Sequence, residues 1–212
     1  MRVKTEAKRD AIIKAASEVF FEAGFEGASM AAIAARVGGS KATLYGYFSS
    51  KEELFLQVTN GEAKQQFDPL LVALAKDTDD IRLALQRFGE RTLAVLCSER
   101  SIRARRAIIA ESGRSDIGKR FFDMGPKVGM TEVSRFMAQQ MAKGVLRQRD
   151  PMVAACQLFS LFDAETVNAR LYGIEPQLSR AQIRRSVKSA VETFMGGFGS
   201  DSGAGTAQKD AD

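Results

Sequence analysis

The chain has 212 residues, 45% hydrophobic and 27% charged, a composition typical of a soluble globular protein long enough to bury a core. Its formal net charge of +5 weakly favours a polyanionic partner, and its lack of histidine removes the commonest general base and zinc ligand. No apolar run reaches the ~18 residues of a membrane span, and no apolar segment follows the basic N-terminus as in a signal peptide. Cys97 and Cys156 have no metal or redox spacing, which fits a reducing compartment. We expect a cytoplasmic protein without a metal site or a cofactor.

Three helices are predicted near the N-terminus, and the second and third are short. Apolar residues spaced three and four apart predict a first helix over residues 5–24. Ser29 is placed to cap a second helix, and the pair Gly38–Gly39 to end it. Ser40 is then placed to cap a third helix over residues 41–48.

The rest of the chain is also predicted to be helical, because it shows no convincing alternating strand pattern. Ser50 and Glu53 have the spacing of a capping box that starts a fourth helix, and Gln66–Pro69 predicts a break after it. Further helices are expected from Asp79 or Asp80 to 96 and over residues 100–112, 115–123, 125–144, 151–173 and 179–195.

Two short helices joined by a tight glycine turn, the second entered through a serine cap, describe a helix-turn-helix. Leu44 and Phe48 lie four residues apart and are expected to face the core. The N-terminal end of the second helix is then free to enter the ~12 Å major groove of DNA and to offer N–H groups to phosphate. Its polar residues, and those at neighbouring helix starts, are therefore candidate DNA contacts. The alternative is an ordinary helical hairpin capped by serines.

The run from residue 8 to residue 56 resembles the helix-turn-helix of the TetR/AcrR family of transcriptional regulators. The matching residues are Phe20-x-x-x-Gly24-Phe25, Ile33-Ala34, Gly38, Ser40, Thr43-Leu44-Tyr45, Tyr47-Phe48 and Lys51-Glu52-x-Leu54. The resemblance implies that Lys41 and Thr43 contact bases or nearby phosphates, and that the tyrosines, Lys51 and Ser29 mainly bind phosphates. The implied DNA-binding set is Ser29, Ser40, Lys41, Ala42, Thr43, Tyr45, Tyr47 and Lys51.

Two glycines depart from the pattern of that family. Gly39 stands where an apolar residue usually packs the turn, and Gly46 stands where a larger side chain is common. Gly46 costs roughly 1 kcal/mol of helix propensity and removes one possible DNA contact. We therefore expect a looser turn and a narrower base readout than in typical members.

The resemblance implies an all-α fold of about nine helices. It would comprise an N-terminal three-helix helix-turn-helix DNA-binding domain over residues 1–56 and a larger helical effector-binding and dimerisation domain over residues 57–198. The polar tail over residues 199–212 is too poor in apolar residues to order itself. Residues 103–171 are similar to the AefR-like C-terminal class, through ARRAIIAES, GRSDIGKRFFDMGP, Gly144-x-Leu146 and Asp150-Pro151-x-x-Ala154-Ala155.

The implied function is a ligand-responsive transcriptional regulator, specifically a repressor. It would bind a palindromic operator in double-stranded DNA as a homodimer and be released by an unknown small-molecule effector. An activator of the same fold is one alternative. A helical ligand-processing enzyme is another, although the sequence offers no paired carboxylates, nucleophile–base pair or phosphate loop.

Three sets of residues in the second domain have both a functional and an ordinary interpretation. Aromatic and methionine side chains could line an effector pocket or form core, namely Phe121, Phe122, Phe136 and Met137. Apolar residues of the last two long helices could form a dimer interface or single-chain core, namely Leu158, Leu161, Phe162, Val187, Val191 and Phe194. A basic cluster could bind an anion or form a solvated or domain-bridging helix face, namely Arg100, Arg103, Arg105 and Arg106.

Overall fold

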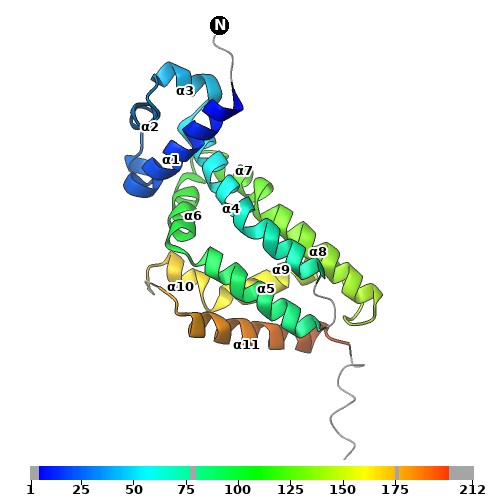
Figure 1. The fold of residues 1–212 in the computed structure, drawn as a ribbon. Helices are drawn as coiled ribbons and strands as arrows, with labels where there is room; N and C mark the ends of the chain where they lie inside the picture. The colour runs from blue at the N-terminus through cyan, green and yellow to red at the C-terminus, as the bar shows by residue number, and fades with distance from the viewer. Residues whose placement is uncertain (1–4, 77–79, 175–176, 201–212) are drawn as a thin grey trace, which may run out of the picture. The chain divides into compact units, whose positions relative to one another are not determined.

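The computed structural model describes residues 5–76, 80–174 and 177–200, and within these ranges it contains helices and no β-strand (Figure 1). The predicted all-α class is thus confirmed. The helices are α1 (Glu6–Gly27), α2 (Met30–Val37), α3 (Lys41–Tyr47), α4 (Lys51–Lys76), α5 (Ile81–Leu96), α6 (Glu99–Glu111), α7 (Ile117–Met124), α8 (Pro126–Ala142), α9 (Pro151–Ala164), α10 (Val167–Leu171) and α11 (Arg180–Phe198). In the described ranges none of them combines the length and apolarity of a membrane-spanning helix.

The described chain divides into two compact units. The first contains residues 5–65 and 99–125, and therefore α1 to α3, the first part of α4, and the pair α6 and α7. The second contains residues 66–98 and 126–200, with the remaining helices and the last part of α4. The predicted domain limits at residues 56 and 198 stay a prediction. The two units are defined by how the helices pack, which does not show whether either part folds independently.

Apolar side chains from six helices form the core of the first unit. Leu44 of α3 is fully buried, and the rings of Phe20 and Phe55 meet edge to face with their centres 5.0 Å apart. Ile108 of α6 and Ile117 of α7 belong to the same buried cluster. The α6–α7 pair is therefore part of the packing that holds the predicted helix-turn-helix.

The core of the second unit depends on a close approach of three helices. A Cβ atom on Gly89 of α5 would lie 2.7 Å from ring carbons of Phe162 on α9 and 2.8 Å from Val187 on α11. Only glycine fits this position without movement of the neighbouring side chains. Leu70 and Leu74, from the last part of α4, are buried in the same cluster.

Helix α4 runs without a break from Lys51 to Lys76, so the predicted interruption at Gln66–Pro69 is wrong. Pro69 removes one backbone donor and costs about 3 kcal/mol in a helix interior. Burial of Leu70 and Leu74 just after it favours continuation of the helix, because the apolar gain offsets the lost hydrogen bond.

Two other boundaries differ from prediction for local reasons. Helix α1 continues to Gly27 beyond a kink at Gly24, whose φ of 73° lies in the left-handed region that glycine tolerates. The helix predicted over residues 151–173 is divided into α9 and α10. At the division the hydroxyl of buried Thr166 donates to the Phe162 carbonyl at 2.9 Å, a side-chain bond that competes with the helical ladder.

The predicted caps are mostly confirmed. Asp80 caps α5 by accepting from the N–H groups of Arg82 and Leu83, while Asp79 lies outside the described residues. Ser50 accepts from the Glu53 N–H at 3.1 Å, but the Glu53 carboxylate accepts from the Ser49 N–H at 2.6 Å and not from Ser50. The Ser49 hydroxyl donates to the same carboxylate, so Ser49 supplies two donors where a capping box uses one.

The start of the tail is ordered, contrary to prediction. Gly199 forms an antiparallel bridge with Leu146, and the Ser200 N–H donates to the Val145 carbonyl at 3.2 Å. These bonds satisfy backbone groups just after the end of α11. The rest of the predicted tail, residues 201–212, lies outside the described residues.

Candidate nucleic-acid interface

The two helix starts that the sequence assigns to DNA are both capped by serine. Ser29 accepts from the Ala32 N–H and Ser40 from the Thr43 N–H, each at 3.1 Å, and both serines are exposed. Each cap uses the serine hydroxyl oxygen as an acceptor and leaves the remaining N–H groups of the first turn available. The two starts therefore retain donors for an anion such as phosphate.

The turn between α2 and α3 is fixed by the first of its two glycines. Gly38 has a φ of 69°, and the N–H of Gly39 donates to the Ala34 carbonyl at 2.9 Å, as in a Schellman motif. A Cβ on Gly39 would contact nothing within 4 Å. The turn thus requires glycine at residue 38. At residue 39, glycine in place of the family's usual apolar residue leaves the hydrogen bonds of the turn intact.

Helix α3 has one buried edge and one open face. Leu44 and Phe48 are buried as predicted, with exposures of 0% and 2%. Lys41, Ala42 and Gly46 are exposed, as is half of Tyr45. Thr43 is half-buried, and its hydroxyl lies 3.0 Å from that of Ser40. Lys41 and Thr43, which are predicted to contact bases or nearby phosphates, therefore share the N-terminal end of one exposed helix.

Tyr47 has a structural partner that sequence reasoning missed. Its hydroxyl oxygen accepts from the N–H of Thr5, the N-cap of α1, at 3.1 Å. The bond joins residues 42 positions apart, so no local pattern indicates it. Tyr47 fixes the end of α3 against the start of α1, and its predicted contact with phosphate would be additional to this bond.

Lys51 also makes internal contacts. Its ammonium donates to the carbonyl oxygens of Phe25 and Ala28 at 2.9 and 3.3 Å, and it lies 4.3 Å from the centre of the Phe25 ring. These groups belong to the end of α1 and the connector that leads to Ser29. Lys51 therefore positions the start of α2, and its predicted phosphate contact can use only the donor that these bonds leave.

A second basic residue near the interface is neutralised within the unit. Arg36 of α2 pairs with Glu22 at 2.7 Å and with Glu18 at 3.2 Å, both on α1. The hydrogen bond from Arg36 lowers the pKa of the Glu22 carboxyl. Arg36 thus ties α2 to α1, and of the two basic residues on these short helices only Lys41 has no ion pair within the described residues.

The basic cluster of α6 has internal partners too. Arg100 forms an ion pair with Glu62 at 2.6 Å and a hydrogen bond with the Ser17 hydroxyl, which joins α6 to α4 and α1. Arg103 pairs with Glu99 at 2.8 Å, and both guanidinium groups lie over the ring of Phe21. For these two arginines the helix-bridging interpretation fits the geometry better than an anion site.

The structure separates the four effector-pocket candidates. Phe121 packs against the core of the first unit, and Phe122 is 46% exposed. Phe136 and Met137 are buried in the core of the second unit. Their role in a pocket stays a prediction.

Of the dimer-interface candidates, all except Leu161 are buried within one chain, at exposures of 0 or 1%. Their burial needs no partner, because they pack in the core cluster of the second unit. Leu161 is half-buried and remains accessible. The interface also stays a prediction.

Comparison with known proteins identifies the family. Residues 12–58 match the family described as bacterial regulatory proteins, tetR family, and residues 83–200 match the AefR-like transcriptional repressor, C-terminal domain. The second match alone covers more than half of the chain.

Individual relatives agree with these matches. A TetR-family transcriptional regulator from Mesorhizobium loti has a TM-score of 0.84 and 28% identity over 93% of this chain and 100% of its own. The flavonoid-responsive regulator FrrA has a TM-score of 0.72 and 30% identity over 92% of this chain and 98% of its own. The transcriptional activator FasR of Mycolicibacterium smegmatis is 38% identical over 90 residues, which are only 41% of that relative's length and 41% of this chain. The chain belongs to the tetR family of bacterial transcriptional regulators.

Proposed function

We propose that this regulator binds a palindromic operator as a homodimer, acts as a repressor, and is released by a small-molecule effector. The observation that carries the proposal is the exposed N-terminal end of α3, with Lys41 and Thr43 beside a capped helix start, on a buried core. A short, exposed and rigidly seated helix is the form that reads a major groove. The match to the AefR-like repressor class supports repression over activation.

A selection experiment tests the DNA-binding part. The full chain is incubated with random duplex DNA, bound sequences are enriched, and the mass of the complex is measured. We expect a palindrome with half-sites about 34–36 Å apart and two chains per site. Failure to enrich any sequence, or enrichment of a single half-site bound by one chain, would contradict the proposal.

An open face on α9 and α11 supports the homodimer. A hollow of about 310 Å³ lies there, bordered by Leu161, Phe198 and small or polar residues such as Ser160 and Gly197. Small residues let the helices of a second copy approach closely, and Leu161 with Phe198 offers apolar area. Leu161→Glu should yield monomers by light scattering, whereas Val128→Glu, an equally apolar but exposed site on α8, should not. Dimers of Leu161→Glu would exclude this face.

Activation is the second candidate function, favoured by the similarity to the activator FasR. The fold is compatible with either sign, because both need the same DNA contacts. A reporter placed behind the selected operator distinguishes them. Lower expression in the presence of the protein supports repression, and higher expression supports activation.

Ligand response is supported by the relative FrrA, which is described as flavonoid-responsive. The family is one of transcriptional regulators, which favours a ligand that is sensed over one that is processed by an enzyme. A sensed ligand must change the affinity for the operator by binding one state of the protein more tightly. A co-purified compound that alters operator binding and is recovered unchanged would support this, whereas its conversion to a product would revive the enzyme alternative.

A further inference from the structure

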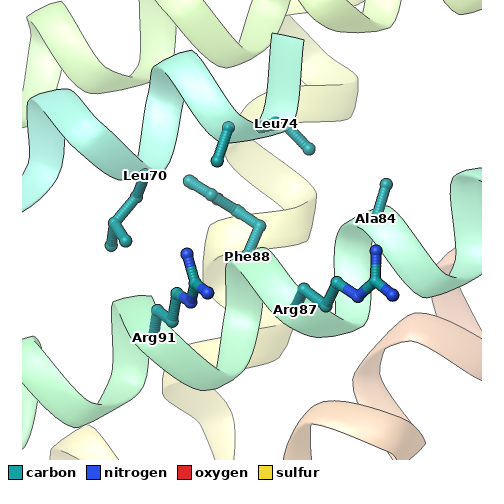
Figure 2. Close-up of a pocket in the computed structure, with 7 residues that line it drawn as sticks. Leu70, Leu74, Ala84, Arg87, Phe88 and Arg91 are labelled. Atoms are coloured by element: carbon teal, nitrogen blue, oxygen red, sulfur yellow. The ribbon is translucent and has the colours of Figure 1, made fainter. Parts of the chain in front are cut away.

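A cavity of about 220 Å³ in the second unit lies between the last part of α4 and the first part of α5. Its apolar wall consists of Leu70, Leu74 and Phe88, and Figure 2 shows Phe88 directed from α5 toward the two leucines of α4. Ala73 and Ala84 also line the cavity, and their short side chains leave the space open. The wall therefore suits a compact apolar group.

Two arginines supply the polar part of the same cavity. Arg87 and Arg91 are one helical turn apart on α5, and Figure 2 shows both guanidinium groups extending from α5 toward α4. Both side chains are exposed at the mouth of the cavity. None of the described residues that line the cavity is acidic. The described charged groups at the mouth are therefore positive, and the interior is apolar.

Arg91 in particular is available to a ligand. It makes no hydrogen bond or ion pair with another residue in the part of the chain that the structure describes. The adjacent Glu90 is directed to Arg184 of α11, 3.9 Å away, and not to Arg91. A guanidinium presents its N–H donors as a planar fork that matches a carboxylate or phosphate group. The arrangement thus selects an anion.

We propose that this cavity binds a small amphiphilic anion, with its carboxylate or phosphate group on Arg91 and its apolar body against Leu70, Leu74 and Phe88. The ligand is compact, because the cavity is smaller than the ~300–1,000 Å³ usual for drug-sized molecules. The identification of this anion as the effector rests on the proposed function. The binding of the anion does not rest on that function, because the cavity lies within the second unit.

Calorimetry on the full chain tests the assignment with three probes: sodium octanoate, octyl phosphate and the neutral 1-octanol. We expect both anions to bind at least about tenfold more tightly than octanol, because only they engage the Arg91 guanidinium group. Arg91→Gln should weaken octanoate about tenfold and leave octanol unchanged. Arg82→Gln is the matched control, since Arg82 is exposed on the same helix and does not line the cavity.

Ala73→Met tests the cavity itself. Ala73 is exposed at the surface of α4 and lines the cavity, so a longer side chain should fill the space without disturbing the buried core. We expect it to weaken all three probes. Circular dichroism melts confirm that each variant is folded, and Arg91→Lys, which keeps the charge but loses the fork, should bind octanoate with intermediate affinity.

Several results would overturn the assignment: no binding of either anion, octanol binding as tightly as octanoate, or equal affinities for Arg91→Gln and Arg82→Gln. Operator binding is measured on the same preparations. Operator binding without anion binding removes the ligand assignment and leaves the regulator intact. Anion binding by a protein that enriches no DNA sequence supports the cavity assignment and contradicts the proposed function.

Discussion

The ammonium of Lys51 donates to the carbonyl oxygen of Phe25 at 2.9 Å and lies 4.3 Å from the centre of the Phe25 ring. The first residue of α4 is thereby joined to the end of α1, where helix carbonyls lack partners and carry partial negative charge. The connector that follows leads directly to Ser29 and the start of α2. Lys51, which is expected to contact a DNA phosphate, therefore also helps to hold the helix-turn-helix against α1.

Lys51→Met should both destabilise the first unit and weaken DNA binding. It removes two charge-assisted hydrogen bonds and a cation–π contact from a half-buried site, at a cost of about 1–2 kcal/mol. Thermal unfolding followed by circular dichroism and operator titrations at several salt concentrations measure the two effects. A drop in DNA affinity with unchanged thermal stability would mean that Lys51 acts mainly on phosphate.

Lys41→Met should weaken DNA binding without destabilising the protein. Lys41 is exposed at the start of α3 and makes no hydrogen bond or ion pair with a residue in the described ranges. We expect unchanged thermal stability, a uniform loss of affinity across DNA sequences, and a decrease of about one in the slope of log affinity against log salt. A salt slope equal to that of the wild type would exclude a phosphate contact by Lys41.

Local signals in the sequence predict much of this fold, because a cap needs only the residues beside it. The caps at Ser29, Ser40 and Asp80 follow from such signals, and so does the burial of Leu44 and Phe48. The family resemblance added the expected roles of the exposed side chains, which spacing alone does not assign.

Features that depend on distant partners could not be predicted. Nothing near Tyr47 indicates that its hydroxyl meets Thr5, and nothing near Pro69 shows that buried leucines hold α4 together across it. The cavity arises in the same way, because Leu70 and Arg91 lie on separate helices and only the packing of α4 and α5 brings them together. Side-chain periodicity identifies faces of helices but not which faces meet.

Thr43→Val should relax the sequence preference of the regulator. The change keeps the shape of the side chain but removes a hydroxyl that lies 3.0 Å from the Ser40 hydroxyl at the N-terminal end of α3. We expect a loss of about 1–3 kcal/mol of discrimination at one base position of each half-site. Binding to a library of single-base operator variants measures this. Thr43→Ser is the matched control and should keep the preference, and a wild-type profile for Thr43→Val would exclude a base contact.

The hydrogen bonds from Ser49 hold the pKa of the Glu53 carboxyl below its ordinary value near 4.5. The ionised carboxylate is thus favoured in the folded state, so its contribution is fully present above about pH 4.5 and is lost as pH falls through the lower folded pKa. We expect Glu53→Gln to flatten the acid side of the thermal stability profile. Glu52→Gln is the control, because the Glu52 carboxylate has no hydrogen bond in the described residues. Parallel profiles for wild type and Glu53→Gln would show that these bonds add no stability.

Gly89→Ala should destabilise the second unit although alanine is the better helix former. The added Cβ would lie 2.7 Å from the Phe162 ring and 2.8 Å from Val187, and both neighbours are fully buried and unable to move aside cheaply. Overpacking of this kind costs about 1–3 kcal/mol, which outweighs the ~1 kcal/mol gained in helix propensity. Gly129→Ala is the matched control, since it lies inside α8 of the same unit and its Cβ would contact nothing within 4 Å. Denaturant unfolding should therefore show a lower midpoint for Gly89→Ala and a slightly higher one for Gly129→Ala, and a raised midpoint for both would mean that the three helices can separate to admit a methyl group.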